Sequence, residues 1–104
     1  MSGDRIAALR ALLEKRPHDA RVRFGLAAAY EAGGQWEEAV TELRAYLRGA
    51  DDEGNAWGRL GGALLRLGRT TEARDAYTRG VEAATRHGHP SMAAEFTDLL
   101  SQLD

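Results

Sequence analysis

The sequence predicts an all-α fold of six antiparallel helices, and two observations carry that prediction. Apolar residues recur at steps of three and four along most of the 104 residues, which is the spacing of one face of a helix. Glycine, proline or acidic residues interrupt this pattern at five places, near residues 17–19, 33–35, 49–52, 68–70 and 87–90. We therefore expect no strand between residues 20 and 87.

The first helix is predicted from about residue 4 to residue 16. Ile6 and Leu9 begin an apolar stripe at helical spacing that continues to the end of this segment. Pro17 ends the helix, because the residue before a proline is pushed away from helical dihedral angles.

The second and third helices are separated by a pair of glycines. The second covers about residues 20–32 and stops at Gly33-Gly34, since glycine adopts a positive φ without steric cost. The third begins at Trp36, carries a regular apolar stripe and closes at Gly49.

The fourth helix is expected at about residues 53–67. Asp51 and Asp52 precede it, where side-chain oxygens accept hydrogen bonds from unpaired amides and negative charge complements the helix dipole. Its interior holds three glycines, at 58, 61 and 62. Each weakens a helix by roughly 1 kcal/mol relative to alanine, so a neighbouring backbone or a ligand must approach closely there.

Gly68 ends the fourth helix, and Thr70 or Thr71 is expected to cap the fifth. The last helix, residues 90–103, follows the loop His87–Pro90. Its apolar stripe fits the pattern of the preceding helices only after a shift of one residue, which indicates a capping helix that covers the end of the fold.

The chain also repeats itself with a period of thirty-four residues. Residues 54–87 map onto residues 20–53, and the coincident pairs include Leu60 with Leu26, Tyr77 with Leu43, Gly68 with Gly34 and Ala73 with Ala39. One further step backwards turns the first helix into the second half of a truncated repeat.

Residues 54–87 carry an ordered motif, Trp57-x-x-Leu60-Gly61-x-x-Leu64, then Gly68, then Ala73-x-x-x-Tyr77. This order and spacing resembles the tetratricopeptide repeat, a helix-turn-helix unit of thirty-four residues. The motif departs from the family pattern at three positions, with Leu64 in place of Tyr, Tyr77 in place of Phe and Thr85 in place of Pro.

The resemblance implies a short right-handed α-solenoid of the kind that small bacterial-type proteins of this family form alone. One domain is then expected over residues 1–104, made of a half-repeat helix at 4–17, repeats at 20–53 and 54–87, and a capping helix at 90–103. Gly61 is expected at the closest contact of the second repeat, facing Ala73. Four aromatic residues are expected in the core, namely Tyr30, Trp36, Trp57 and Tyr77.

The function that the resemblance implies is protein–protein recognition in a concave groove lined by the first helices of successive repeats. Carried onto this chain, the groove positions are Arg21, Phe24, Ala28 and Glu31 on one helix and Asn55, Arg59, Gly62, Leu65 and Arg66 on the next. Guanidinium groups match carboxylates, so an acidic or C-terminal peptide is the expected ligand. The alternative is that these arginines form an ordinary solvated helix face.

A clamp for the acidic tails of heat-shock chaperones is not expected, because Phe24 and Ala28 stand where that clamp has Lys and Asn. Self-association into a homodimer is the main competing function, because the outer face of the first helix has no preceding helix to pack against.

Composition argues against several other partners. Fourteen basic and sixteen acidic residues give a net charge of −2, so there is no electrostatic reason to bind nucleic acid. No apolar run approaches the roughly 20 residues that cross a bilayer, and the N-terminus does not resemble a secretory signal. The absence of cysteine fits the cytoplasm. Lys15 is the only lysine, and this arginine bias is typical of a GC-rich bacterial genome.

Candidate catalytic and metal-binding residues are few. His87 and His89 form an HxH pair, but a metal site would need a third ligand from Asp or Glu, and a solvated loop is the better interpretation. Acidic pairs such as Glu37-Glu38 lie at helix starts, where they complement the dipole. We expect no catalytic activity, no cofactor, no metal and no small-molecule substrate.

Overall fold

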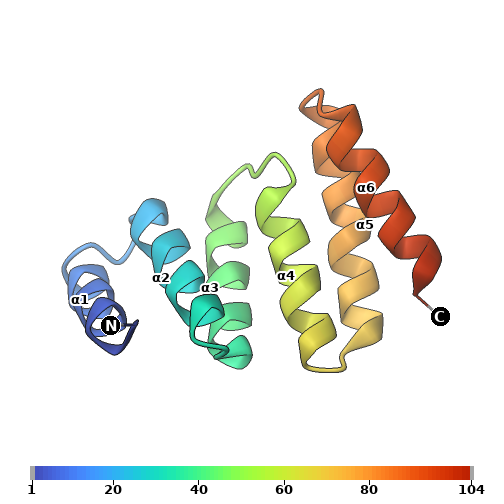
Figure 1. Ribbon diagram of the computed structural model, residues 1–104. Coiled ribbons are helices and arrows are strands. Elements are labelled where there is room, and N and C mark those ends of the chain that lie inside the picture. The colour runs from blue at the N-terminus through green and yellow to red at the C-terminus, as the bar shows by residue number, and fades with distance from the viewer. Residues whose placement is uncertain (1, 104) are drawn as a thin grey trace. The chain divides into compact units, whose positions relative to one another are not determined.

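The computed structural model describes residues 2–103, and these residues fold entirely into helices and short connections (Figure 1). The helices are α1 (Ser2–Lys15), α2 (Ala20–Ala32), α3 (Trp36–Gly49), α4 (Asn55–Arg66), α5 (Thr70–Arg86) and α6 (Pro90–Gln102). The predicted all-α class is confirmed, and the described part of the chain contains no strand. No helix in it combines the length and the apolar composition that a membrane span requires.

The chain divides into two compact units, Met1–Ala50 and Asp51–Asp104, which we call the N-terminal unit and the C-terminal unit. In the N-terminal unit α2 packs against both α1 and α3, and in the C-terminal unit α5 packs against both α4 and α6 (Figure 1).

The thirty-four-residue period is visible in the backbone of the turns. The Gln35 amide donates to the Tyr30 carbonyl at 2.9 Å, and the Arg69 amide donates to the Leu64 carbonyl at 2.9 Å. The residue before each amide is a glycine with positive φ, +71° at Gly34 in the first turn and +75° in the second. Both turns therefore end a helix with the same Schellman-type hydrogen bond.

Carboxylates cap two of the helices. Asp19 accepts hydrogen bonds from the amides of Arg21 and Val22 at the start of α2. Asp52 accepts from the amides of Gly54 and Ala56 at 2.8 and 2.9 Å, which confirms its predicted role at the start of α4.

The predicted threonine cap of the fifth helix is wrong. Arg69 occupies the N-cap position of α5 without a capping side-chain hydrogen bond, and Thr70 is already the first helical residue. The Schellman-type turn from α4 leaves no non-helical position for Thr70 to fill.

The core of the N-terminal unit is built around α2. Leu26 and Tyr30 are buried together with Ala39 of α3, and Ile6, Leu9 and Leu13 of α1 pack against them. Arg10 of α1 also donates a hydrogen bond to the hydroxyl of Tyr30. The apolar stripe of α1 is therefore used inside its own unit.

Aromatic rings fill the space left by the interior glycines of the C-terminal unit. A Cβ on Gly61 would lie 2.8 Å from the ring of Tyr77, so the expected close contact exists, and Tyr77 is the side chain nearest to it. A Cβ on Gly58 would lie 2.5 Å from the ring of Phe96. The Tyr77 and Phe96 rings are 5.7 Å apart between centroids, a favourable tilted contact.

The expected aromatic core is only half correct. Tyr30 and Tyr77 are buried, whereas Trp36 and Trp57 are half-buried. The guanidinium of Arg79 lies 5.7 Å from the centre of the Trp57 ring, within the range of a cation–π contact. Trp57 thus covers the junction of α4 and α5 from outside the core.

Candidate functional site

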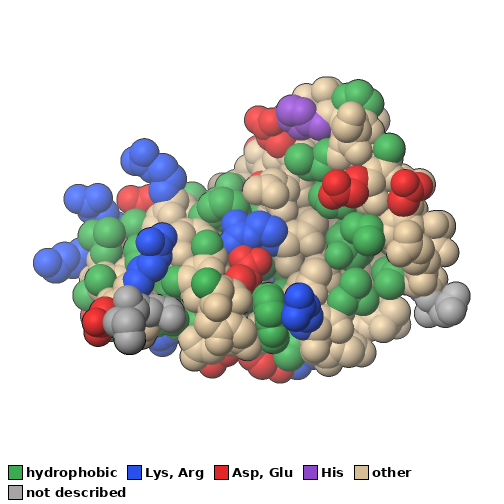
Figure 2. Space-filling model, viewed as in Figure 1, with side chains coloured by type: hydrophobic (Ala, Val, Ile, Leu, Met, Phe, Trp, Pro, Cys, Tyr) green, Lys and Arg blue, Asp and Glu red, His purple; other side chains and the backbone are tan. Residues whose placement is uncertain are grey.

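The C-terminal unit contains a groove of about 480 Å³ with walls from α4 and α6. The lining residues are Asn55, Gly58 and Arg59 of α4, Tyr77 of α5, and Ser91, Met92, Glu95, Phe96 and Leu99 of α6. Figure 2 shows apolar surface over α5 and α6 with acidic side chains beside it.

The groove owes its shape to glycines that let α6 approach its neighbours. Phe96 reaches the backbone of Gly58 on α4 and of Gly80 on α5, where an added Cβ would lie 2.5 and 2.9 Å from its ring. The thioether of Met92 comes equally close to Gly54, just before α4 begins. α6 is therefore held by side chains that enter gaps in the adjacent helices, and these side chains form the floor of the groove.

The floor is apolar and the rims are polar. Burial raises the pKa of the Tyr77 phenol, and the negative charge of Glu95 raises it further. Asn55 and Arg59 lie on the α4 rim, while Ser91 and Glu95 lie on the α6 rim. An apolar side chain can pack on this floor while its backbone or a charged group contacts either rim.

The structure brings two of the predicted binding residues of α4 into this groove. Asn55 is exposed and Arg59 is half-buried, and both line it. Leu65 and Arg66 lie at the last turn of α4 and are not among the lining residues. Gly62 is also outside the lining.

The predicted residues of α2 belong to the N-terminal unit. Arg21 is exposed in the first turn of α2, and Glu31 is half-buried near its end. Phe24 packs against α3, with its ring centroid 4.9 Å from that of Tyr46. Ala28 lines a small cavity of about 230 Å³ beside α1. A groove shared by the residues of α2 and α4 stays a prediction.

Sequence reasoning missed the wall that α6 contributes. The sequence predicts only a capping role for the apolar stripe of α6, whereas Met92, Phe96 and Leu99 also line the groove. The signal that points to this wall is the pair Gly58 and Gly80, because helical glycines of this kind mark places where a neighbouring side chain enters.

A larger cavity, about 590 Å³, lies between α2 and α3 in the N-terminal unit. Of its two lining arginines, Arg23 and Arg48, the first forms a 2.9 Å ion pair with Glu42 and donates to the Pro17 carbonyl at 3.1 Å. These contacts give Arg23 a structural role.

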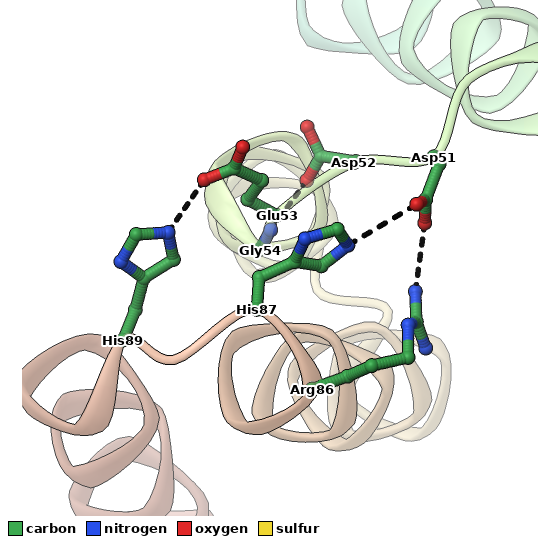
Figure 3. A network of polar contacts seen from close by, with 7 residues as sticks. All are labelled: Asp51, Asp52, Glu53, Gly54, Arg86, His87 and His89. Atoms are coloured by element: carbon green, nitrogen blue, oxygen red, sulfur yellow. Dashed lines mark hydrogen bonds and ion pairs between the residues drawn. The ribbon is translucent and has the colours of Figure 1, made fainter.

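His87 and His89 point to different carboxylates of the segment before α4 (Figure 3). The Nε2 atom of His87 lies 3.3 Å from Asp51 Oδ2, without the geometry of a hydrogen bond, and the Nε2 atom of His89 contacts Glu53 Oε1. No group of three candidate metal ligands occurs within residues 2–103. The HxH pair is therefore part of a polar contact between two loops.

These contacts change the acidity of both carboxyl groups. The pKa of Asp51 is lowered most by His87 and next by Arg86. The guanidinium of Arg86 donates a hydrogen bond to Asp51 at 2.8 Å. His89 lowers the pKa of Glu53 by its contact and its charge. Both carboxylates stay ionised to lower pH than usual.

Comparisons with known proteins agree with the repeat seen in the turns. A family model described as tetratricopeptide repeat matches residues 6–58. A "TPR repeat-containing protein PA0015" of Pseudomonas aeruginosa is 31% identical over 99 residues, which cover 95% of this chain and 94% of the relative.

Two solved structures share the fold. PcrH, crystallised in complex with the chaperone binding region of PopD, superposes with a TM-score of 0.86 at 22% identity, covering 97% of this chain and 77% of that one. MamA of AMB-1 superposes with a TM-score of 0.68 at 23% identity, covering 97% and 68%. The family model and the bacterial relative together show that this chain belongs to the tetratricopeptide-repeat family.

Proposed function

We propose that this protein is an interaction module that binds a peptide segment of a partner protein in the groove between α4 and α6. The observation that carries the proposal is the groove itself, about 480 Å³ in volume, with an apolar floor and polar rims. Concave sites with a few placed polar groups are the usual form of a specific binding site. Membership of the family and the PcrH complex with a region of PopD support binding of a protein segment.

The chemistry of the groove suggests the class of peptide. An apolar side chain packs against Phe96 and Leu99, while a carboxylate meets the α4 rim at Asn55 and Arg59, because a guanidinium presents forked donors to a carboxylate. Glu95 on the opposite rim takes a donor, such as a backbone amide. The proposed ligand is thus an apolar segment flanked by an acidic or C-terminal carboxylate.

Affinity capture with matched variants tests this proposal. Leu99→Lys places a charge on the apolar floor, whereas Thr97→Lys makes the same charge change at an exposed position of α6 outside the groove. A specific partner is retained from native extract by the wild type and Thr97→Lys and is lost with Leu99→Lys. A partner retained equally by all three proteins binds another surface, and the proposal fails.

Self-association is the second candidate. The exposed face of α1 carries Ala7, Ala8 and Ala11, so another copy can approach it closely. The larger apolar side chains of α1 are engaged in its own unit, which favours the peptide-binding function. Light scattering over a range of concentrations distinguishes self-association from peptide binding. A homodimer through α1 doubles the measured mass, and Ala8→Glu returns the mass to that of the monomer.

We further propose that residues 1–104 act as one domain in the cytoplasm, without catalytic activity and without binding nucleic acid. The absence of cysteine supports the cytoplasmic location, and the balanced charge supports the absence of nucleic-acid binding.

A further inference from the structure

A polar contact lies at one end of the groove. α4 and α6 begin at the same end, and Glu53, two residues before Asn55, contacts His89, two residues before Ser91 (Figure 3). Asn55 and Ser91 line opposite rims of the groove. The Glu53–His89 contact therefore joins the segments from which the two walls start.

The two acidic residues beside Glu53 have other partners, so neither of them competes for His89. Asp51 accepts from Arg86 and lies 3.3 Å from His87, and Asp52 accepts from the amides of Gly54 and Ala56. The charges facing the Glu53–His89 pair are thus Asp51 and Asp52 from the same segment, with Arg86 and His87 from the end of α5 and the following turn.

Close packing makes the groove sensitive to this contact. Gly54 has φ of +129°, and an added Cβ there would lie 2.7 Å from the sulfur of Met92 in the first turn of α6. The starts of α4 and α6 therefore meet without side-chain bulk at position 54, and a change in the spacing of the two segments moves the groove rims directly.

The strength of the contact depends on the charge of the imidazole. A histidine typically gains its proton between pH 8 and pH 5, a range in which a carboxylate is ionised. The carboxylate is ionised in both states of the imidazole, so protonation adds the attraction between opposite charges to a hydrogen bond whose acceptor is already charged. The side chains of His89 and Glu53 are 41% and 61% exposed, so protons reach them freely.

We propose that Glu53 and His89 form a proton-strengthened latch that fixes the spacing of the first turns of α4 and α6 and thereby regulates the groove. The effect of the latch on peptide binding rests on the proposed function, whereas the latch itself is a property of the C-terminal unit. His89 is a positioning residue that acts on the peptide through the spacing of the walls. Mild acidification holds the groove in one width, and neutral to alkaline pH lets the width vary.

Spin labels test the latch without any ligand. The chain has no cysteine, so Asn55→Cys and Ser91→Cys provide one labelled pair across the end of the groove. Dipolar spectroscopy is expected to show the distance distribution narrowing between pH 8 and pH 5.5, with the latched population rising about two- to fivefold, as suits an exposed ion pair.

Three further variants decide whether the latch causes the narrowing. His89→Gln and Glu53→Gln abolish it, whereas His18→Gln, an exposed histidine of the N-terminal unit, leaves it intact. Narrowing that persists in both His89→Gln and Glu53→Gln overturns the proposal. Two variants are used so that a local structural change caused by one substitution is not mistaken for loss of the latch.

The consequence for binding is tested with the unlabelled chain. The probe is the protein captured in a Leu99-dependent manner, and its affinity is measured at pH 5.5 and pH 8 for the wild type, His89→Gln and His18→Gln. Regulation is supported if the affinity depends on pH in the wild type and in His18→Gln but not in His89→Gln. It is overturned if the affinity of His89→Gln depends on pH as strongly as that of the wild type. If no Leu99-dependent protein is captured, the proposed function fails while the spin-label result still decides the latch.

Discussion

The ring of Phe96 rests on the backbone of Gly58, so that a single added methyl group would lie 2.5 Å from it. Phe96 is also buried against Gly80, and its ring contacts Tyr77. One aromatic side chain of α6 thus joins all three helices of the C-terminal unit, and the glycines opposite it determine where α6 lies.

Gly58→Ala is expected to destabilise the C-terminal unit in spite of the better helix propensity of alanine. The added methyl forces the Phe96 ring to move, and overpacking of this kind costs about 1–3 kcal/mol. Gly62→Ala is the matched control, because its Cβ would lie 3.8 Å from the Tyr77 hydroxyl, an ordinary contact. Urea denaturation should show a lower midpoint for Gly58→Ala and an unchanged or higher one for Gly62→Ala. Equal midpoints would mean that Phe96 does not occupy this position.

Gly61→Leu is expected to cost about 1–3 kcal/mol, because the new side chain enters the space of the Tyr77 ring. A double-mutant cycle identifies the partner. The cost of Gly61→Ala should fall in a Tyr77→Leu background and should not fall in an Ala73→Gly background. Coupling to Ala73 alone would show that Ala73, and not Tyr77, is the partner that limits the size of residue 61.

Strong acid, below about pH 4, is expected to weaken the contact between the segment before α4 and the α5–α6 turn, because the carboxylates are then protonated. The folded-state pKa values of Asp51 and Glu53 lie below their usual values because of His87, Arg86 and His89. A lowered carboxyl pKa gives stability that is complete above the unfolded-state pKa, about 4, and is lost as the pH falls through the folded-state pKa.

Melting temperatures of the wild type and Asp51→Asn, measured from pH 7 down to pH 2.5, test this expectation. The wild type should exceed the variant at pH 7, and the difference should shrink below about pH 4. Glu82→Gln, an equal charge change at an exposed position of α5, is the control. A difference that does not depend on pH would contradict the role of the Asp51 carboxylate.

The helices were predictable from sequence because their ends are encoded locally. Gly34 and Gly68 adopt a positive φ at the helix ends, and Pro90 begins α6, so each boundary depends on a few adjacent residues. The period of thirty-four residues reappears in the turn hydrogen bonds for the same reason.

The contacts between helices were less predictable, because they depend on how the helices cross. The sequence marked Gly61 as a place of close approach but did not reveal that Tyr77 fills it. Likewise, Asp51 was expected at a helix end, whereas it pairs with Arg86, thirty-five residues away. The α6 wall of the groove is another contact that depends on how the helices cross. For this reason only two of the predicted binding residues, Asn55 and Arg59, line that groove.

Salt and charge reversal provide the sharpest test of the binding surface. If a carboxylate of the peptide meets Arg59, the affinity should fall as NaCl rises, because exposed charges are screened beyond about 10 Å at 0.1 M ionic strength. Arg59→Glu should weaken binding strongly, since it opposes the carboxylate in the groove. Arg66→Glu makes the same change on the same helix outside the groove and should have a small effect that salt removes. A partner whose affinity ignores salt and Arg59→Glu binds another face, and self-association through α1 then becomes the better explanation for the exposed surface of this chain.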